Sequence, residues 1–100
     1  MRSFIFKIQP RVYDEIQNGI TYYNTKQKGL GRKFHIAVKS SFEIIRESPF
    51  YQVRYENVRC FPVTKFPFMV HYIIDESNNT IIVYALINTH LDPETSYINK

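Results

Sequence analysis

The sequence contains a single cysteine among its 100 residues, Cys60, and this scarcity excludes several kinds of protein. One cysteine cannot form a disulfide within the chain, and it leaves no thiolate cluster for a structural zinc ion. Because Val58 and Phe61 are apolar, we expect Cys60 to be buried as a small hydrophobic group rather than exposed as a catalytic thiol. No spacing of His, Asp or Glu suggests a metal site either, and we expect no metal or cofactor.

The chain also lacks an apolar run of the roughly eighteen residues that a membrane-spanning helix needs. Lys65, His71 and the polar residues 75–80 interrupt its richest apolar region. The first residues, MRSFIFKIQPR, contain neither a long apolar stretch nor a small-residue cleavage site, which argues against a secretory signal. We therefore expect a soluble cytoplasmic protein, and the length predicts a single domain spanning residues 1–100.

Two common catalytic arrangements are missing as well. Gly29 and Gly31 lie between two expected helices and lack the Lys and Ser/Thr of a phosphate-binding loop. Asp75 and Glu76 are adjacent in a turn, where their side chains point apart, so they do not form a carboxylate pair for acid–base catalysis.

The first half of the chain predicts a strand followed by two helices. Residues 2–8 alternate between an apolar and a more polar row, as a strand with one buried face does. From Pro10, apolar residues recur every three or four positions, which predicts a helix. Its apolar face contains Val12, Tyr13, Ile16, Ile20 and Tyr23. Gly29 has the backbone freedom that a C-cap needs, and the second helix that follows it is expected to end before Pro49. Its apolar face contains Leu30, Phe34, Ala37, Val38, Ser41, Phe42 and Ile45.

The second half predicts antiparallel strands. Residues 58–93 are rich in β-branched and aromatic side chains, and the polar residues 75–79 form a hairpin signal in their middle. Pro62 and Pro67 cannot donate to a ladder, so they indicate an edge, a bulge or a strand start. The order of elements predicts an α+β fold, in which a helical hairpin covers one face of an antiparallel sheet that consists of the first strand and a three- to four-stranded meander.

Both rows of side chains on the last strand are apolar. One row contains Val83, Ala85 and Ile87, and the other contains Ile82, Tyr84 and Leu86. An apolar sheet face without a covering layer is typical of a partner surface, so we expect an obligate partner chain on the face that the helices leave open.

The formal net charge of +4 is unevenly distributed. Residues 1–50 contain nine Lys or Arg against four Asp or Glu, whereas residues 51–100 contain four against five. Five bases between Ile16 and Phe42 have no acid among them: Lys26, Lys28, Arg32, Lys33 and Lys39. Such a field attracts nucleic acid or an acidic partner, although a solvated helix face has the same pattern.

Several segments, in this order, resemble the RelE/ParE superfamily of toxin–antitoxin toxins, and the ParE-like plasmid stabilisation branch most. They are Tyr22 and Tyr23, GLGRKF (29–34), ESP (47–49), VRCFPVTKFPFMVHYIID (58–75) and NTHLDP (88–93). The resemblance implies a two-layer RelE/ParE-like fold and a toxin that is neutralised by a cognate antitoxin encoded beside it, in a hetero-oligomer. ParE-like members are associated with DNA gyrase inhibition, and RelE-like members with ribosome-dependent mRNA cleavage.

The residues that the resemblance links to RNA cleavage are replaced in this chain. Met69 stands where RelE-like nucleases often have an arginine, Asn88 stands where many have a histidine, and Leu91 stands at their following arginine. Cleavage needs a base, an acid and a cation. The remaining catalytic candidates are Arg59 and Lys65 as cations, His71 and His90 as titrating groups, and Tyr84 or Tyr97 as proton donors.

Each candidate has a simpler interpretation: His71 is a partly buried strand residue satisfied by a neighbour, His90 is solvated, and Lys65 guards a sheet edge. The leading hypothesis is therefore a toxin that binds its target, with Lys26, Lys28, Arg32, Lys33 and Lys39 as the contact surface. An mRNA endoribonuclease and a decayed toxin that still binds its antitoxin are the alternatives. For the antitoxin, we expect its C-terminal segment to cover apolar sheet and helix surface, with a strand added at a sheet edge as one mode.

Overall fold

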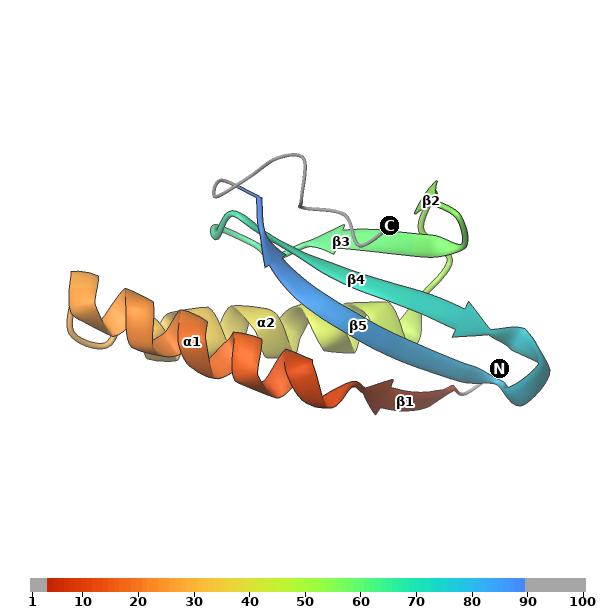
Figure 1. Cartoon of the computed structure of the whole chain (residues 1–100), viewed down its shortest axis with the longest axis horizontal. Helices are drawn as coiled ribbons and strands as arrows, with labels where there is room; N and C mark the ends of the chain where they lie inside the picture. Colours follow the sequence, from red (N-terminus) through yellow and green to blue (C-terminus); the bar gives the residue numbers. More distant parts are fainter. Residues whose placement is uncertain (1–3, 90–100) are drawn as a thin grey trace.

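A computed structural model describes residues 4–89 of the chain. The elements, in chain order, are β1 (Ile5–Ile8), α1 (Pro10–Lys26), α2 (Leu30–Glu47), β2 (Val53–Tyr55), β3 (Val58–Pro62), β4 (Phe68–Asp75), the 3-10 turn η1 (Glu76–Asn78) and β5 (Thr80–Asn88). Two antiparallel helices form one layer and a curved sheet forms the other (Figure 1). The predicted α+β class and order of elements are confirmed.

The sheet is mixed. Its strand order is β1-β5-β4-β3-β2, and β2 to β5 form the expected antiparallel meander. β1 instead pairs with β5 in parallel, with Ile5 opposite Thr80 and Ile8 opposite Val83. The expectation of a wholly antiparallel layer is wrong at this strand. A tight turn forces its two strands to be antiparallel, but the two helices that follow β1 leave it free to align with the open edge of β5 in either direction.

The turn between β4 and β5 has the predicted chemistry. The Asp75 carboxylate accepts hydrogen bonds from Ser77 Oγ at 2.9 Å and Asn78 Nδ2 at 2.8 Å. These bonds hold the pKa of Asp75 below its usual value. Asn79 takes the left-handed conformation, with φ 54°, which an asparagine adopts more readily than most residues. The polar break at residues 75–79 is therefore the hairpin that the sequence predicts.

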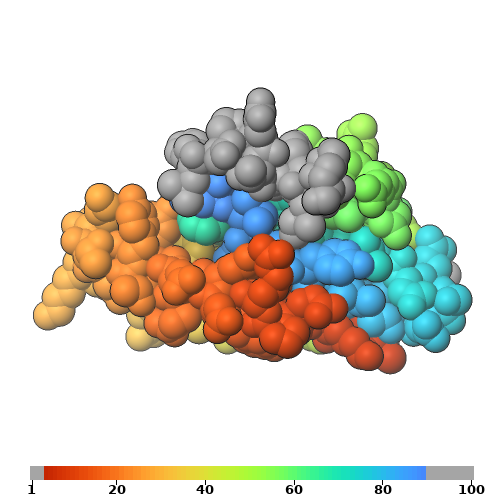
Figure 2. All heavy atoms as spheres, viewed as in Figure 1, coloured from red at the N-terminus to blue at the C-terminus, as the bar shows by residue number. Residues whose placement is uncertain are grey.

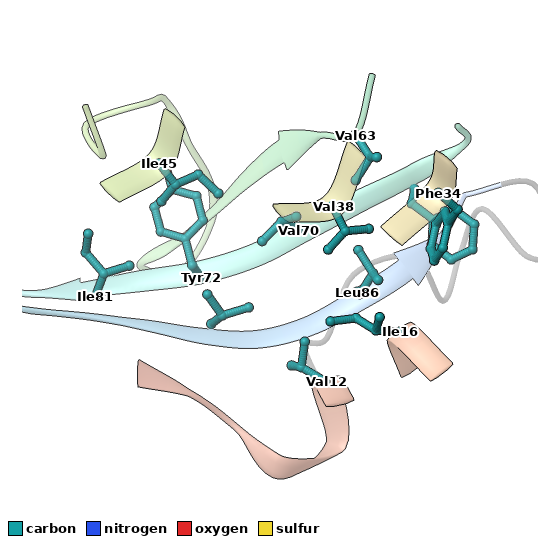
Figure 3. Packing of buried hydrophobic residues seen from close by; sticks show 12 residues of the cluster. Val12, Ile16, Phe34, Val38, Ile45, Val63, Val70, Tyr72, Ile81 and Leu86 are labelled. Atoms are coloured by element: carbon teal, nitrogen blue, oxygen red, sulfur yellow. The ribbon is translucent and has the colours of Figure 1, made fainter. Parts of the chain in front are cut away.

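The core lies between the helices and one face of the sheet (Figure 3). It contains Val12 and Ile16 of α1, Phe34, Val38 and Ile45 of α2, Val63, Val70, Tyr72, Ile81 and Leu86. The helix faces predicted from the sequence supply these side chains, with one correction. Tyr13 is 59% exposed. It lies at the rim of the stripe, since consecutive helical residues are about 100° apart and Val12 already points to the core.

A β-bulge at Tyr84 changes the rows predicted for β5. His71 is opposite Ala85 and the next residue, Tyr72, is opposite Val83, so Tyr84 is an additional residue in β5. The row that faces the helices consists of Ile81, Val83 and Leu86. The predicted rows, which grouped Val83 with Ala85 and Leu86 with Ile82, are wrong because strict alternation does not survive an inserted residue.

The open face of the sheet is less exposed than the sequence suggests. Met69, Ile73, Ile82 and Ile87 are half-buried there, and Val58, Cys60, His71 and Ala85 are buried. Large exposed apolar side chains lie elsewhere: Ile5, Tyr13, Tyr22, Ile36, Ile44, Phe50, Tyr51 and Val53. The exposed apolar surface expected on the sheet thus lies mainly on the helices and the outer strands.

Close contact between the two helices depends on glycine at two positions. A β-carbon at Gly19 would lie 2.4 Å from the Phe34 ring, and one at Gly31 would lie 2.5 Å from the carbonyl oxygen of Ile20. The Gly31 N–H donates to Asn24 Oδ1 at 2.9 Å, which ties the start of α2 to α1. Between the helices, Gly29 adopts a left-handed conformation, with φ 84°, but it is the N-cap of α2. The C-cap of α1 is Gln27, so the C-cap expected at Gly29 is wrong by two residues.

Replacing Gly31 by alanine is expected to lower the free energy of unfolding by about 1–3 kcal/mol, because the added carbon meets helix backbone that cannot move aside. The sign of this change in the free energy of unfolding is informative, because alanine inside a helix otherwise stabilises a protein by up to about 1 kcal/mol relative to glycine. Urea unfolding of Gly31→Ala beside Ser40→Ala, an exposed position on α2, measures the effect. A Gly31→Ala protein as stable as the wild type would contradict the close packing.

Candidate functional site

The five predicted contact residues form an exposed basic surface on the helical hairpin. Lys26 ends α1, Lys28 lies in the connection, and the other three are on α2: Arg32, Lys33 and Lys39. All five side chains are exposed. Within residues 4–89 the one ion pair joins Arg11 to Glu15, so none of the hairpin bases is held in an ion pair there. The Lys26 ammonium lies 5.2 Å from the centre of the Tyr22 ring and thus interacts with an exposed aromatic.

His71 is buried on the sheet face opposite the helices. Its Nδ1 lies 3.1 Å from Tyr55 Oη, and Cys60 Sγ is 3.7 Å from the same nitrogen. Burial, with a smaller contribution from the charge of Arg11, lowers the pKa of His71 from 6.5 to about 4. The imidazole is therefore neutral at pH 7 and enclosed. This agrees with the interpretation of His71 as a strand residue satisfied by a neighbour.

Cys60 is buried opposite His71 in the β3–β4 ladder, as the sequence predicts. Burial raises the pKa of its thiol to about 11, and the opposing effect of Arg54 is smaller. A thiol with so high a pKa is not a nucleophile at neutral pH. Tyr55, Cys60 and His71 thus form a neutral polar cluster.

Arg59 stands on the other face of the sheet from His71, because its cross-strand partner is the core residue Tyr72. Its guanidinium donates to the carbonyl oxygen of Tyr51 and lies 5.5 Å from the centre of the Phe50 ring. Tyr72 Oη donates to the carbonyl oxygen of Pro49 at 2.7 Å, in the same loop. Arg59 therefore holds the α2–β2 connection in place. The sequence does not predict this role, because the partners of Arg59 are a backbone carbonyl and an aromatic ring in a loop that has no recognisable sequence pattern.

The other catalytic candidates are scattered. Lys65 is exposed in the β3–β4 turn, whereas Tyr84 is half-buried at the β5 bulge. Tyr84 lines a pocket of about 420 Å³ together with Gln9, Pro10 and Arg11. The structure places His71 beside Cys60, but it brings neither of the candidate cations, Arg59 and Lys65, to this pair. His90 and Tyr97 lie outside the described residues, as does Leu91.

Sequence reasoning also missed the role of Glu15. Its Oε1 accepts a hydrogen bond from the Leu86 backbone N–H at 2.8 Å, and its Oε2 pairs with Arg11 at 2.6 Å. β1 pairs with β5 only as far as Val83, so the carboxylate covers the edge where β1 ends. Figure 2 looks onto the seam between α1 (red to orange) and β5 (blue). The separation of Glu15 and Leu86 in sequence left no local signal for this contact.

Searches with the sequence find no matching family model and no matching curated protein. The structure does match a solved chain. It is similar to a chain of the chromosomal ParDE toxin–antitoxin system from P. aeruginosa, with a TM-score of 0.74 over 84% of this chain and 94% of that chain. The chain has a ParE-like fold. The two chains are 9% identical, so the likeness is in the arrangement of elements rather than in particular residues.

On this ParE-like fold, the basic hairpin surface is the most extensive charged feature described above. Residues 4–89 contain no cluster of three or more His, Cys, Asp or Glu side chains that could hold a metal ion. The helices of this part of the chain are too short or too polar to cross a membrane. The arrangement is suited to binding an anionic or acidic surface.

Proposed function

We propose that this chain is the toxin of a type II toxin–antitoxin module, that it acts by binding DNA gyrase, and that a cognate antitoxin neutralises it in the cytoplasm. The observation that carries the proposal is the ParE-like fold, which extends over 84% of the chain. The segments that resemble RelE/ParE toxins in the sequence support it independently of the structural match.

Binding rather than catalysis is supported by the candidate catalytic groups themselves. His71 is buried with a pKa of about 4, Arg59 is engaged with the α2–β2 connection, and Met69 occupies the position expected for the nuclease arginine. Proton transfer at neutral pH requires an accessible group whose pKa lies near 7. By contrast, the hairpin bases are exposed, and within residues 4–89 none of them forms an ion pair, which favours electrostatic recognition of an acidic or DNA-bound target.

Purified protein is expected to inhibit supercoiling by DNA gyrase. A variant with all five hairpin bases replaced by alanine is expected to inhibit at least 10-fold more weakly, which corresponds to a loss of about 1.4 kcal/mol of binding free energy. The five replaced residues are Lys26, Lys28, Arg32, Lys33 and Lys39. The control variant, Lys7→Ala with Arg54→Ala, removes exposed bases from the two outer strands and should retain inhibition. No inhibition by a large excess of folded wild-type protein would remove gyrase as the target.

The nuclease and decayed-toxin alternatives make different predictions. A RelE-like nuclease would cleave a reporter mRNA on the ribosome, and the cleavage would be lost in Arg59→Ala, Lys65→Ala and His71→Ala. We expect no such cleavage. A decayed toxin would permit normal growth when expressed in a bacterial host without antitoxin, whereas the proposed function predicts growth arrest.

A further inference from the structure

The outer edge of β1 pairs with no other strand of residues 4–89. Among these residues β1 is the last strand on its side of the sheet, and its neighbour is β5. The Ile5 N–H donates to the carbonyl oxygen of Asn79 at 2.8 Å, just before β5. Because the backbone groups of successive strand residues point to alternate sides, the N–H and C=O of Phe6 and Ile8 point away from β5. β1 therefore presents an open hydrogen-bonding edge that fits another strand.

The side chains of β1 alternate between the two faces of the sheet. Phe6 and Ile8 are half-buried and pack against the core on the helix side. On the other face, Ile5 is 57% exposed and Lys7 is exposed. Proteins commonly protect an edge strand with charges, proline or a bulge, but β1 has one charged residue, no proline and no bulge in its pairing with β5. The edge is thus largely apolar as well as open.

A hollow of about 180 Å³ lies on the helix side of β1, between this strand and α2. It is lined by Phe6, Ile8, Lys39, Phe42, Glu43 and Arg46. The Phe6 ring centre lies 5.6 Å from that of Phe42 and 5.2 Å from the Arg46 guanidinium, so its neighbours hold the ring in place. The hollow has room for an apolar side chain from beyond the edge, and its charged lining contains both signs.

The edge of β1 is complementary to a second copy of itself. In an antiparallel pair centred on Phe6, the two Phe6 residues exchange both backbone hydrogen bonds, and Ile5 of each copy lies opposite Lys7 of the other. The aliphatic part of Lys7 then covers the exposed Ile5 side chain. Both Phe6 side chains point to the helix side, where each reaches the hollow of the other copy. A pair centred on Lys7 would instead set two like charges directly opposite each other, which is unfavourable.

We propose that two copies of this chain associate through β1, as an antiparallel strand pair that joins their sheets into one. Both copies use the same edge, so the symmetry is two-fold and assembly stops at a dimer. A contact of four strand residues from each copy is at the small end of protein interfaces, so association depends on protein concentration. The connection between α1 and α2, with Lys28, lies at the end of α1 distant from β1 (Figure 1), and this part of the basic hairpin surface stays uncovered.

The test is analytical ultracentrifugation of the purified protein over a roughly 100-fold range of concentration, in which the wild type is expected to shift from monomer to dimer. Ile5→Lys sets like charges opposite each other at both Lys7 positions. Ile5→Glu removes the same apolar side chain but sets a carboxylate opposite each Lys7. The association constant of Ile5→Glu is therefore expected to exceed that of Ile5→Lys by about 10-fold or more, the sum of two cross-strand pairs.

Ile36→Lys is the matched control, because it makes the same change at a position of α2 that is 53% exposed, and it should leave the monomer–dimer equilibrium unchanged. Circular dichroism of each variant as a monomer distinguishes lost association from a damaged fold. A wild type that stays monomeric or forms species larger than a dimer would overturn the inference, as would equal association of Ile5→Lys and Ile5→Glu. These measurements contain neither gyrase nor antitoxin, so their outcome is separate from that of the proposed function.

Discussion

Replacing Phe34 by alanine is expected to lower the free energy of unfolding by about 3–5 kcal/mol, the range for truncating a buried aromatic side chain. Phe34 is fully buried where the two helices meet the sheet. Its ring centre lies 4.8 Å from that of Phe68, 5.2 Å from that of Tyr23 and 5.3 Å from that of Phe66. The truncation removes the centre of this cluster, and the rigid helices cannot close the resulting cavity.

Since small domains are stable by only about 5–15 kcal/mol, Phe34→Ala should be partly unfolded at temperatures where the wild type is folded. Chemical denaturation followed by circular dichroism measures the difference. Phe50→Ala makes the same chemical change at a position that is 54% exposed, and it should cost less than half as much. A similar cost at both positions would show that Phe34 does not occupy the centre of the core.

Acidification is expected to destabilise the protein through His71. The pKa of this side chain is 6.5 in an unfolded chain and about 4 in the folded one, so the unfolded state binds a proton first as the pH falls. The contribution of His71 is fully present above pH 6.5 and is lost progressively as the pH falls towards 4. At about 1.4 kcal/mol for each pKa unit, the full loss is at most about 3.5 kcal/mol.

The variant His71→Gln removes the titrating group while it keeps a polar side chain for the Tyr55 hydroxyl. Its free energy of unfolding should change less between pH 7 and pH 4 than that of the wild type, although it is less stable at pH 7. His35→Gln makes the same chemical change on the exposed face of α2 and serves as the control. A His71→Gln protein with the full acid sensitivity of the wild type would assign the effect to other groups.

The sequence predicts the elements whose signals are local. The apolar stripes of both helices, the left-handed Gly29 and the polar hairpin at residues 75–79 follow from patterns a few residues long, and all three are present. Glycine and the helix period dictate such features through backbone sterics and side-chain spacing, which do not depend on distant parts of the chain.

The features that the sequence does not predict depend on distant partners. The parallel pairing of β1, the β5 bulge at Tyr84, and the bond from the Leu86 amide to Glu15 each involve residues from different parts of the chain. For the candidate site, the exposure of the four hairpin bases on the helices follows from the helix period, and Lys28 lies in the connection between them. The hollow between β1 and α2 does not follow from any local pattern, because its two walls are distant in the sequence.

The pairing of β1 with β5 has a consequence for synthesis on the ribosome. β1 cannot pair with its neighbour until residues 80–83 have left the exit tunnel. The growing polypeptide therefore cannot complete its sheet early, and truncated products that end before β5 lack the strand that joins β1 to β4. For a protein proposed to be harmful to the cell that makes it, this delay confines activity to chains whose synthesis has passed β5.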